Sequence, residues 1–287
     1  MRHIESTFQG VGGISLYRQV WQPDGPARVA IVIVHGIGEH SSRYGHVVNH
    51  LVPQGYAIWA YDHRGHGRSG GHPVHVDRWE EYREDLRTFL SLVSEQGRGL
   101  PLFLYGHSMG GLIVLDYLEQ HQEGLRGAIL STAAIQPVGV AKPHLVALAR
   151  ALSPIVPRLA IPTGLDISTL SRDPTVVQAY RADPLVRRAA TVRFGTEALA
   201  AVARVRAGLG AIRLPVLIIH GGADRLHAPE GSRLAFTQIA SEDKTLRIYP
   251  ETYHEPHNDV NRDEVLCDVE RWLEQRSIVR SMPDSIG

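Results

Sequence analysis

The chain has 287 residues, of which 43% are hydrophobic, and this composition suits one large globular domain or a core with a smaller insert. Its 30 basic and 30 acidic side chains balance, which gives no basis for expecting a nucleic-acid partner. No apolar run reaches the ~20 residues that a membrane-spanning helix needs.

Strand-like and helix-like segments alternate along most of the chain. Residues 4–8 and 14–21 flank a glycine-rich turn and predict an antiparallel hairpin. Short apolar runs then predict buried strands at 29–34, 57–61, 102–105, 127–131, 214–219 and 246–249. Amphipathic patterns predict helices near 44–51, 77–95, 111–118, 230–239 and 263–276. The alternation predicts an α/β fold, with helices flanking a mostly parallel central sheet.

The alternation stops between residues 134 and 199. This stretch contains seven prolines and helical fragments at 145–155 and 176–180, but no clear strand pattern. We therefore predict a core formed by 1–133 and 200–276, interrupted by a helical cap at 134–199, with a flexible tail at 277–287. The single cysteine, Cys267, excludes an intrachain disulfide, and its helical surroundings predict a buried thiol.

The segment Gly106-His107-Ser108-Met109-Gly110 matches the pattern G-x-S-x-G. An apolar strand precedes it and a helical pattern follows it, which is the context of a nucleophile elbow. In such an elbow a tight turn exposes the serine hydroxyl at the end of a sheet. Without this context the match is weak, because a glycine-rich turn with a surface serine has the same pattern.

Two later residues occupy the places of the acid and the base that a serine nucleophile needs. Asp224 follows the predicted strand 214–219, and His254 follows the strand 246–249. The order Ser, Asp, His, each after a strand, is that of hydrolases with such an elbow. Taken alone, Asp224 is equally explained as a turn or capping residue, and His254 as a solvated loop side chain.

An oxyanion hole needs two N–H donors beside the nucleophile. The N–H of Met109, which follows Ser108, is one candidate. The second should come from the loop after the strand 29–34, where His35-Gly36-Ile37-Gly38 has two glycines. We expect the N–H of Ile37 to be this donor; an ordinary turn at the strand end is the alternative.

Several segments together resemble the monoacylglycerol lipase and lysophospholipase branch of the α/β-hydrolases. They are 35–44, 62–69, 106–111, 221–224 and 253–254, and residues 171–174 resemble bacterial members. The resemblance implies an α/β-hydrolase fold with a helical cap. It implies that Ser108, Asp224 and His254 form the triad, and that Ile37 and Met109 supply the oxyanion hole.

The same resemblance places three polar side chains around a glycerol leaving group, namely Glu39, Arg43 and His257. Structural hydrogen bonding is the alternative for all three, and for Arg43 and His257 it has nearly equal weight. The implied substrate is a monoacylglycerol or a similar single-chain lipid ester, cleaved without a metal or organic cofactor. A histidine-rich loop at 63–75 lacks the spacing of a metal site.

Other functions remain open from the residues alone. A lysophospholipase or a general carboxylesterase would use the same triad, as would a peptidase or a thioesterase. A catalytically silent binding module of the same fold is the alternative from another class. The apolar stretch 145–157 in the cap predicts transient contact with a membrane surface. Residues 1–6 lack the apolar region of a secretory signal, so we expect a cytoplasmic protein.

Overall fold

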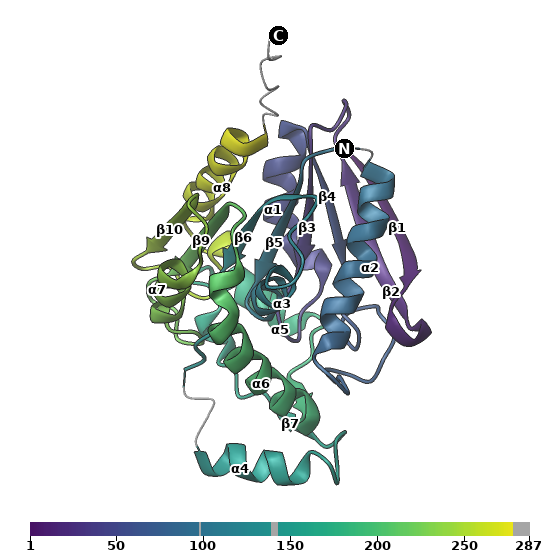
Figure 1. Ribbon diagram of the computed structural model, residues 1–287, viewed down its shortest axis with the longest axis vertical. Helices are drawn as coiled ribbons and strands as arrows, with labels where there is room; N and C mark the ends of the chain where they lie inside the picture. The colour runs from purple at the N-terminus through teal and green to yellow at the C-terminus, as the bar shows by residue number, and fades with distance from the viewer. Residues whose placement is uncertain (98, 139–142, 278–287) are drawn as a thin grey trace, which may run out of the picture.

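A computed structural model describes residues 1–97, 99–138 and 143–277 of the chain. Eight strands form one sheet in the order β1-β2-β4-β3-β5-β6-β9-β10 (Figure 1). β1 and β2 pair antiparallel, as do β2 and β4, and every later pair in the order is parallel. The strands are β1 Arg2–Gln9, β2 Ser15–Gln22, β3 Val29–Val34, β4 Tyr56–Tyr61, β5 Leu102–His107, β6 Leu125–Ser131, β9 Val216–Gly221 and β10 Lys244–Tyr249. The predicted hairpin and mostly parallel sheet are confirmed.

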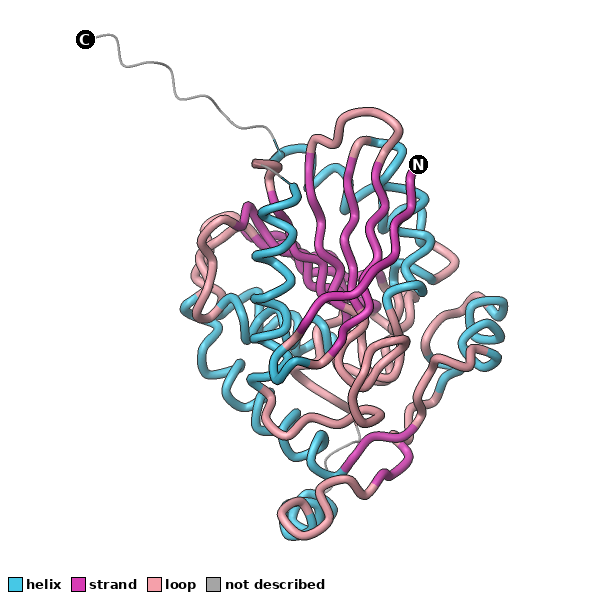
Figure 2. Tube along the Cα trace, turned by 90° about the vertical axis from the view of Figure 1, so that its right-hand side faces the viewer, coloured by secondary structure: helices cyan, strands magenta, loops and turns pink. Residues whose placement is uncertain are grey.

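Helices cover both faces of the sheet, as Figures 1 and 2 show. One face packs on a core to which α2, α3, α6 and α7 contribute, and the other on a core that includes α1 and α8. The central strands β3, β4, β5 and β9 are buried along their whole length, which explains their largely apolar sequences. The helices of the two layers are α1 Gly45–Leu51, α2 Glu80–Gly97, α3 Met109–Leu118, α6 Val192–Gly208, α7 Pro229–Gln238 and α8 Arg262–Ser277.

Residues between β6 and β9 form elements outside the main sheet. They include α4 Pro143–Leu152, α5 Pro174–Ala182 and a two-stranded antiparallel sheet of β7 Ala160–Pro162 and β8 Ala189–Thr191. No strand was predicted here, because three residues are too few for an alternation to show. Helix α4 lies at the bottom of Figure 1, beside α6. The boundary expected between residues 199 and 200 falls inside α6.

Short 3-10 helices occur at Val11–Gly13, Ser41–Tyr44, Val52–Gln54, Ile167–Thr169, Leu209–Ala211 and Pro256–Asn258.

The expectation of a buried Cys267 was wrong: the side chain is exposed, because it falls on the outer face of α8 between buried Leu266 and Val269. Of the expected tail, residues 278–287 lie outside the described part of the chain. No helix among the described residues is long and apolar enough to cross a membrane.

The parallel strands direct several loops to one edge of the sheet. β3, β5, β6, β9 and β10 run in the same direction, so their carboxyl ends share this edge. In open α/β sheets, ligands bind in the crevice outside the carboxyl ends of the strands. All the catalytic candidates found in the sequence follow one of these strands.

Candidate active site

Ser108 lies in a strained turn between β5 and α3. Its backbone angles, φ 51° and ψ −118°, are unusual for a residue with a side chain. The turn depends on close approach of neighbouring backbones, because a Cβ atom at Gly110 would lie 1.9 Å from the carbonyl oxygen of Val34. A Cβ at Gly106 would lie 2.8 Å from the carbonyl oxygen of Gly110. Only glycine fits at both positions, so the sequence pattern has a mechanical cause here.

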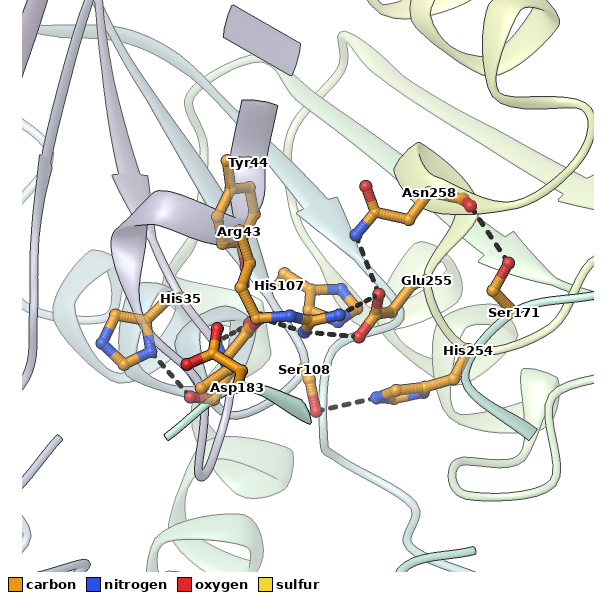
Figure 3. Close-up of polar contacts among 12 residues, drawn as sticks. His35, Arg43, Tyr44, His107, Ser108, Ser171, Asp183, His254, Glu255 and Asn258 are labelled. Carbon is orange, nitrogen blue, oxygen red and sulfur yellow. Dashed lines mark hydrogen bonds and ion pairs between the residues drawn. The ribbon is translucent and has the colours of Figure 1, made fainter. Parts of the chain in front are cut away.

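The structure brings Ser108, His254 and Asp224 together in one hydrogen-bonded chain. His254 Nε2 lies 3.0 Å from Ser108 Oγ (Figure 3), and His254 Nδ1 lies 2.8 Å from Asp224 Oδ2. All three residues are buried. With the Nδ1 proton donated to the carboxylate, Nε2 is free to accept the serine proton.

Local contacts hold the acid and the base in place. Asp224 Oδ1 accepts hydrogen bonds from the backbone N–H groups of Leu226 and His227, at 2.7 and 3.1 Å. The carbonyl oxygen of His254 accepts a hydrogen bond of 2.9 Å from the hydroxyl of Thr132. Thr132 follows β6 and has a positive φ of 45°. The strained backbone of Thr132 therefore places its hydroxyl where it holds the loop of His254.

Charges around this chain favour an ionised acid and a basic imidazole. Burial alone would raise the pKa of Asp224, but the charge of His254 and hydrogen bonds from His220 and His254 hold it well below its usual range. Burial alone would lower the pKa of His254, and the Asp224 carboxylate outweighs it and raises the pKa. The neighbouring His107 has a strongly lowered pKa, because it is buried beside other histidines.

The loop after β3 lies against the nucleophile. A Cβ atom at Gly36 would lie 3.3 Å from Ser108 Cβ, and Ile37 lines the cavity at Ser108. The N–H of Gly36 donates to Glu39 Oε1 at 2.6 Å, so it is engaged within the loop and leaves the next N–H, that of Ile37, as the candidate donor. Met109 is the first residue of α3, where an N–H has no acceptor within the helix.

Buried histidines hold the same loop from behind. His35 Nδ1 donates to the carbonyl oxygen of Gly36 at 2.7 Å, and His35 Nε2 accepts from the N–H of His63 at 2.9 Å. His63 Nε2 in turn donates to the carbonyl oxygen of His35 at 3.0 Å. Burial lowers the pKa of His63 to about 3, so these imidazoles are neutral. Among the residues described, no cluster of three or more potential metal ligands is present.

A small cavity opens at Ser108. Its wall has an apolar side and a charged side. The apolar side includes Leu165, Leu170 and Leu226, of which the first two belong to the stretch between β6 and β9. The charged side consists of Glu39, Arg43 and Glu255, with Tyr180 across it. This lining suits a substrate that has both an apolar chain and a polar group.

The charged side is a buried cluster of one cation between two carboxylates. Arg43 donates to Glu255 through two nitrogens at 2.8 and 2.9 Å (Figure 3). It also donates to Glu39 Oε2 at 2.7 Å. Its guanidinium also lies over the ring of Tyr180, 4.6 Å from the centroid. Burial alone would raise the pKa of Glu255, but Arg43 lowers it to about 2. Burial and the nearby Glu255 raise the pKa of Glu39.

His257 lies elsewhere. The residues that line the cavity include Glu39 and Arg43 but not His257, which is fully buried and stacks on Tyr44 with a centroid distance of 4.9 Å. Burial lowers its pKa to about 3. The Tyr44 ring covers one face of this imidazole, and the role of His257 beside a leaving group stays a prediction.

Three residues near Ser108 were missed from the sequence. Glu255 directly follows the expected base, Thr132 directly follows β6, and His227 comes three residues after the expected acid. Their only sequence signal is this adjacency, which alone does not show that a side chain points toward the site. His227 Nε2 lies 3.4 Å from Ser108 Oγ.

A buried serine at a strained elbow, paired with histidine and aspartate at the carboxyl edge of a mostly parallel sheet, defines a serine hydrolase of the α/β-hydrolase fold. Sequence comparison assigns the chain more narrowly. It belongs to the family described as serine aminopeptidase, S33, which matches residues 25–261.

Curated relatives and solved structures agree with this assignment. The chain is 39% identical to a monoacylglycerol lipase of Mycolicibacterium smegmatis, over 94% of this chain and 96% of that protein. It is 34% identical to the human monoglyceride lipase, over 92% of this chain and 88% of that protein. The crystal structure of Paleococcus ferrophilus monoacylglycerol lipase superposes with a TM-score of 0.83 and 35% identity, over 91% of this chain and 99% of that one. The family resemblance inferred from the motifs is confirmed.

Proposed function

We propose that this protein is a carboxylic-ester hydrolase that cleaves monoacylglycerols to fatty acid and glycerol. The observation that carries the proposal is the hydrogen-bonded chain of Asp224, His254 and Ser108 at a cavity with one apolar and one charged side. The relatives named monoacylglycerol lipase, similar over nearly the whole chain, support the same substrate.

In this mechanism Ser108 is the nucleophile and His254 the general base. His254 Nε2 takes the hydroxyl proton while Ser108 Oγ attacks the ester carbonyl, and the proton then passes to the departing glycerol oxygen. Water repeats the cycle on the acyl-enzyme and releases the fatty acid. Asp224 stabilises the charged imidazole in both halves. The N–H groups of Ile37 and Met109 hold the oxyanion, where one such donor is worth about 3–4 kcal/mol.

The charged side of the cavity favours a neutral alcohol over an anionic headgroup. With both carboxylates ionised, Glu39, Arg43 and Glu255 carry one net negative charge, and the guanidinium is already satisfied by carboxylates. A glycerol hydroxyl can donate to these oxygens, whereas a phosphodiester would be repelled. We therefore rank lysophospholipids below monoacylglycerols, although one relative, 28% identical, is the Bacillus subtilis phospholipase YtpA.

We further propose that residues 134–199 act as a cap that contacts lipid. Of eight exposed large hydrophobic side chains in the described part of the chain, six lie in this stretch. They are Val138, Leu148, Ile155, Val156, Leu159 and Ile161. Reversible contact with a membrane surface would deliver a single-chain lipid to Ser108. The cytoplasmic location expected from the sequence stays a prediction.

Vesicle binding tests the cap proposal. Leu148→Ser and Ile155→Ser together should reduce co-sedimentation with phosphatidylcholine vesicles and lower activity on micellar monoacylglycerol. Their activity on a short soluble ester should not change. Val260→Ser removes an equally exposed apolar side chain outside the cap and is the matched control. Unchanged vesicle binding in the double variant would contradict membrane contact through the cap.

A substrate panel tests the function. Values of kcat/KM should be highest for monoacylglycerols, lower for lysophosphatidylcholine, and lowest for triacylglycerols, which carry three acyl chains. A p-nitrophenyl ester and an aminoacyl p-nitroanilide complete the panel, the latter because the family is described as aminopeptidases. Faster cleavage of the anilide or the lysophospholipid than of any monoacylglycerol would refute the proposed substrate.

A further inference from the structure

A second histidine lies beside Ser108 and has no role in the mechanism above. His227 Nε2 is 3.4 Å from Ser108 Oγ, while His254 Nε2 is 3.0 Å from the same atom. The two imidazole rings are neighbours, with centroids 5.1 Å apart. His227 also lines the cavity at Ser108. The serine oxygen is therefore flanked by two imidazole nitrogens.

The backbone of His227 is held by three contacts. Its N–H donates to Asp224 Oδ1 at 3.1 Å, and its carbonyl oxygen accepts from His220 Nε2 at 3.0 Å. It also forms a β-bridge with Pro137, at the start of the stretch between β6 and β9. The loop that presents the acid to His254 thus presents His227 to Ser108.

The proton count decides how His227 and Ser108 interact. A serine hydroxyl has one proton, and catalysis requires that it point to His254 Nε2. A hydrogen bond from His227 to the same oxygen must then use a proton on His227 Nε2. His227 Nδ1 is buried without a hydrogen-bond partner among the described residues. A bare Nδ1 lone pair is tolerated there better than an orphaned N–H, which favours the Nε2–H form.

His227 is a poor candidate for a second general base. Its Nδ1 faces no carboxylate in the described structure, whereas the Asp224 carboxylate stands behind His254. Burial and the charge of His254 lower the pKa of His227 to about 3, so the ring stays neutral in the working pH range. A neutral imidazole with a proton on Nε2 remains a hydrogen-bond donor throughout the cycle.

We propose that His227 is a second catalytic histidine, whose Nε2–H donates to Ser108 Oγ. This bond directs the hydroxyl proton toward His254 and stabilises the negative charge that grows on Oγ as the proton leaves. The 3.4 Å separation is long for a neutral hydroxyl and shortens as charge develops, since charge-assisted hydrogen bonds are shorter and stronger. The inference rests on the proposed role of Ser108 as nucleophile, but not on the identity of the substrate.

The test measures the nucleophilicity of Ser108 directly. A fluorophosphonate probe reacts with the serine oxygen, so its second-order labelling rate does not depend on glycerol or acyl-chain recognition. Two variants are compared: His227→Gln, whose amide can still donate, and His227→Leu, which cannot. His121→Gln, a partly exposed histidine beside Tyr117, is the control. Thermal unfolding midpoints are recorded for every protein.

We expect His227→Leu to be labelled about tenfold more slowly than the wild type, as for the loss of one hydrogen bond to a developing charge. His227→Gln should stay within about threefold of the wild type, and kcat for a p-nitrophenyl ester should follow the labelling rates while KM changes little. Equal rates for Gln and Leu, or a Leu variant within twofold of the wild type, would overturn this role alone. Absence of label on the wild type would refute the role of Ser108 as nucleophile, and the role of His227 with it.

Discussion

Replacing Arg43 by methionine should strongly destabilise the fold, because it leaves two buried carboxylates without their cation. The Arg43 side chain is 9% exposed, and those of Glu39 and Glu255 are 4% and 2% exposed. Breaking a buried ion pair by removing one partner typically costs about 3–5 kcal/mol. The lowered pKa of Glu255 indicates a free energy of similar size. This pKa falls from its ordinary 4.5 to about 2, which corresponds to roughly 3 kcal/mol.

The cost should depend on pH with a defined sign. In the wild type the lowered pKa of Glu255 stabilises the fold above pH 4.5, and this stabilisation is lost as the pH falls toward 2. In Arg43→Met both buried carboxylates should have raised pKa values, so they destabilise the fold at neutral pH and cease to do so once protonated. The difference between wild type and variant should therefore be larger at pH 7.5 than at pH 5.

Urea unfolding followed by tryptophan fluorescence measures this difference at both pH values. Arg271→Met is the matched control: this arginine pairs with Asp268 but is 63% exposed, so its loss should cost less than about 1 kcal/mol. Adding Glu255→Gln to Arg43→Met should recover part of the stability, because it removes one buried charge. A cost below about 1 kcal/mol for Arg43→Met, or an equal cost at both pH values, would refute the reasoning.

Three further predictions concern the elbow and the triad. Ser108→Ala should abolish ester turnover and fluorophosphonate labelling while the unfolding midpoint stays within a few degrees of the wild type. Asp224→Asn should lower kcat about 10⁴-fold, and the acid limb of its pH–rate profile should move to lower pH, because Asp224 raises the pKa of His254. Gly110→Ala should prevent formation of the elbow and give little folded protein by circular dichroism, since its Cβ would lie 1.9 Å from a carbonyl oxygen of β3. Gly45→Ala is the control and should fold normally, because there is open space around Gly45.

Much of the fold was readable from periodicity. The fully buried strand β3 is an unbroken apolar run, and buried and exposed positions alternate along α2 with a helical period. The strands β7 and β8 were not readable, since three residues are too few to show a period: all of β7 is exposed, whereas two of the three residues of β8 are buried. Cys267 was misplaced for a related reason, because its neighbours at Leu266 and Val269 are buried while it faces outward.

The sequence by itself determined where the chemistry could lie. The sequence has a serine framed by glycines between a strand and a helix, and an aspartate and a histidine after later strands. If the strands are parallel, few arrangements of these three side chains are possible. Ser108, Asp224 and His254 were found this way because strand ends align at one edge of the sheet. The substrate class came from motif resemblance, not from these spacings.

Only the tertiary structure decided which side chains share the cavity. Glu255 joins Arg43 from 212 positions away in the chain, and His227 reaches Ser108 across 119 positions. His257 shares a motif with His254 yet turns to stack on Tyr44. Side-chain direction in a loop depends on backbone contacts with distant segments, and these contacts exist only once the chain has folded. Position along the sequence therefore located the elbow, while packing around it selected the side chains beside Ser108.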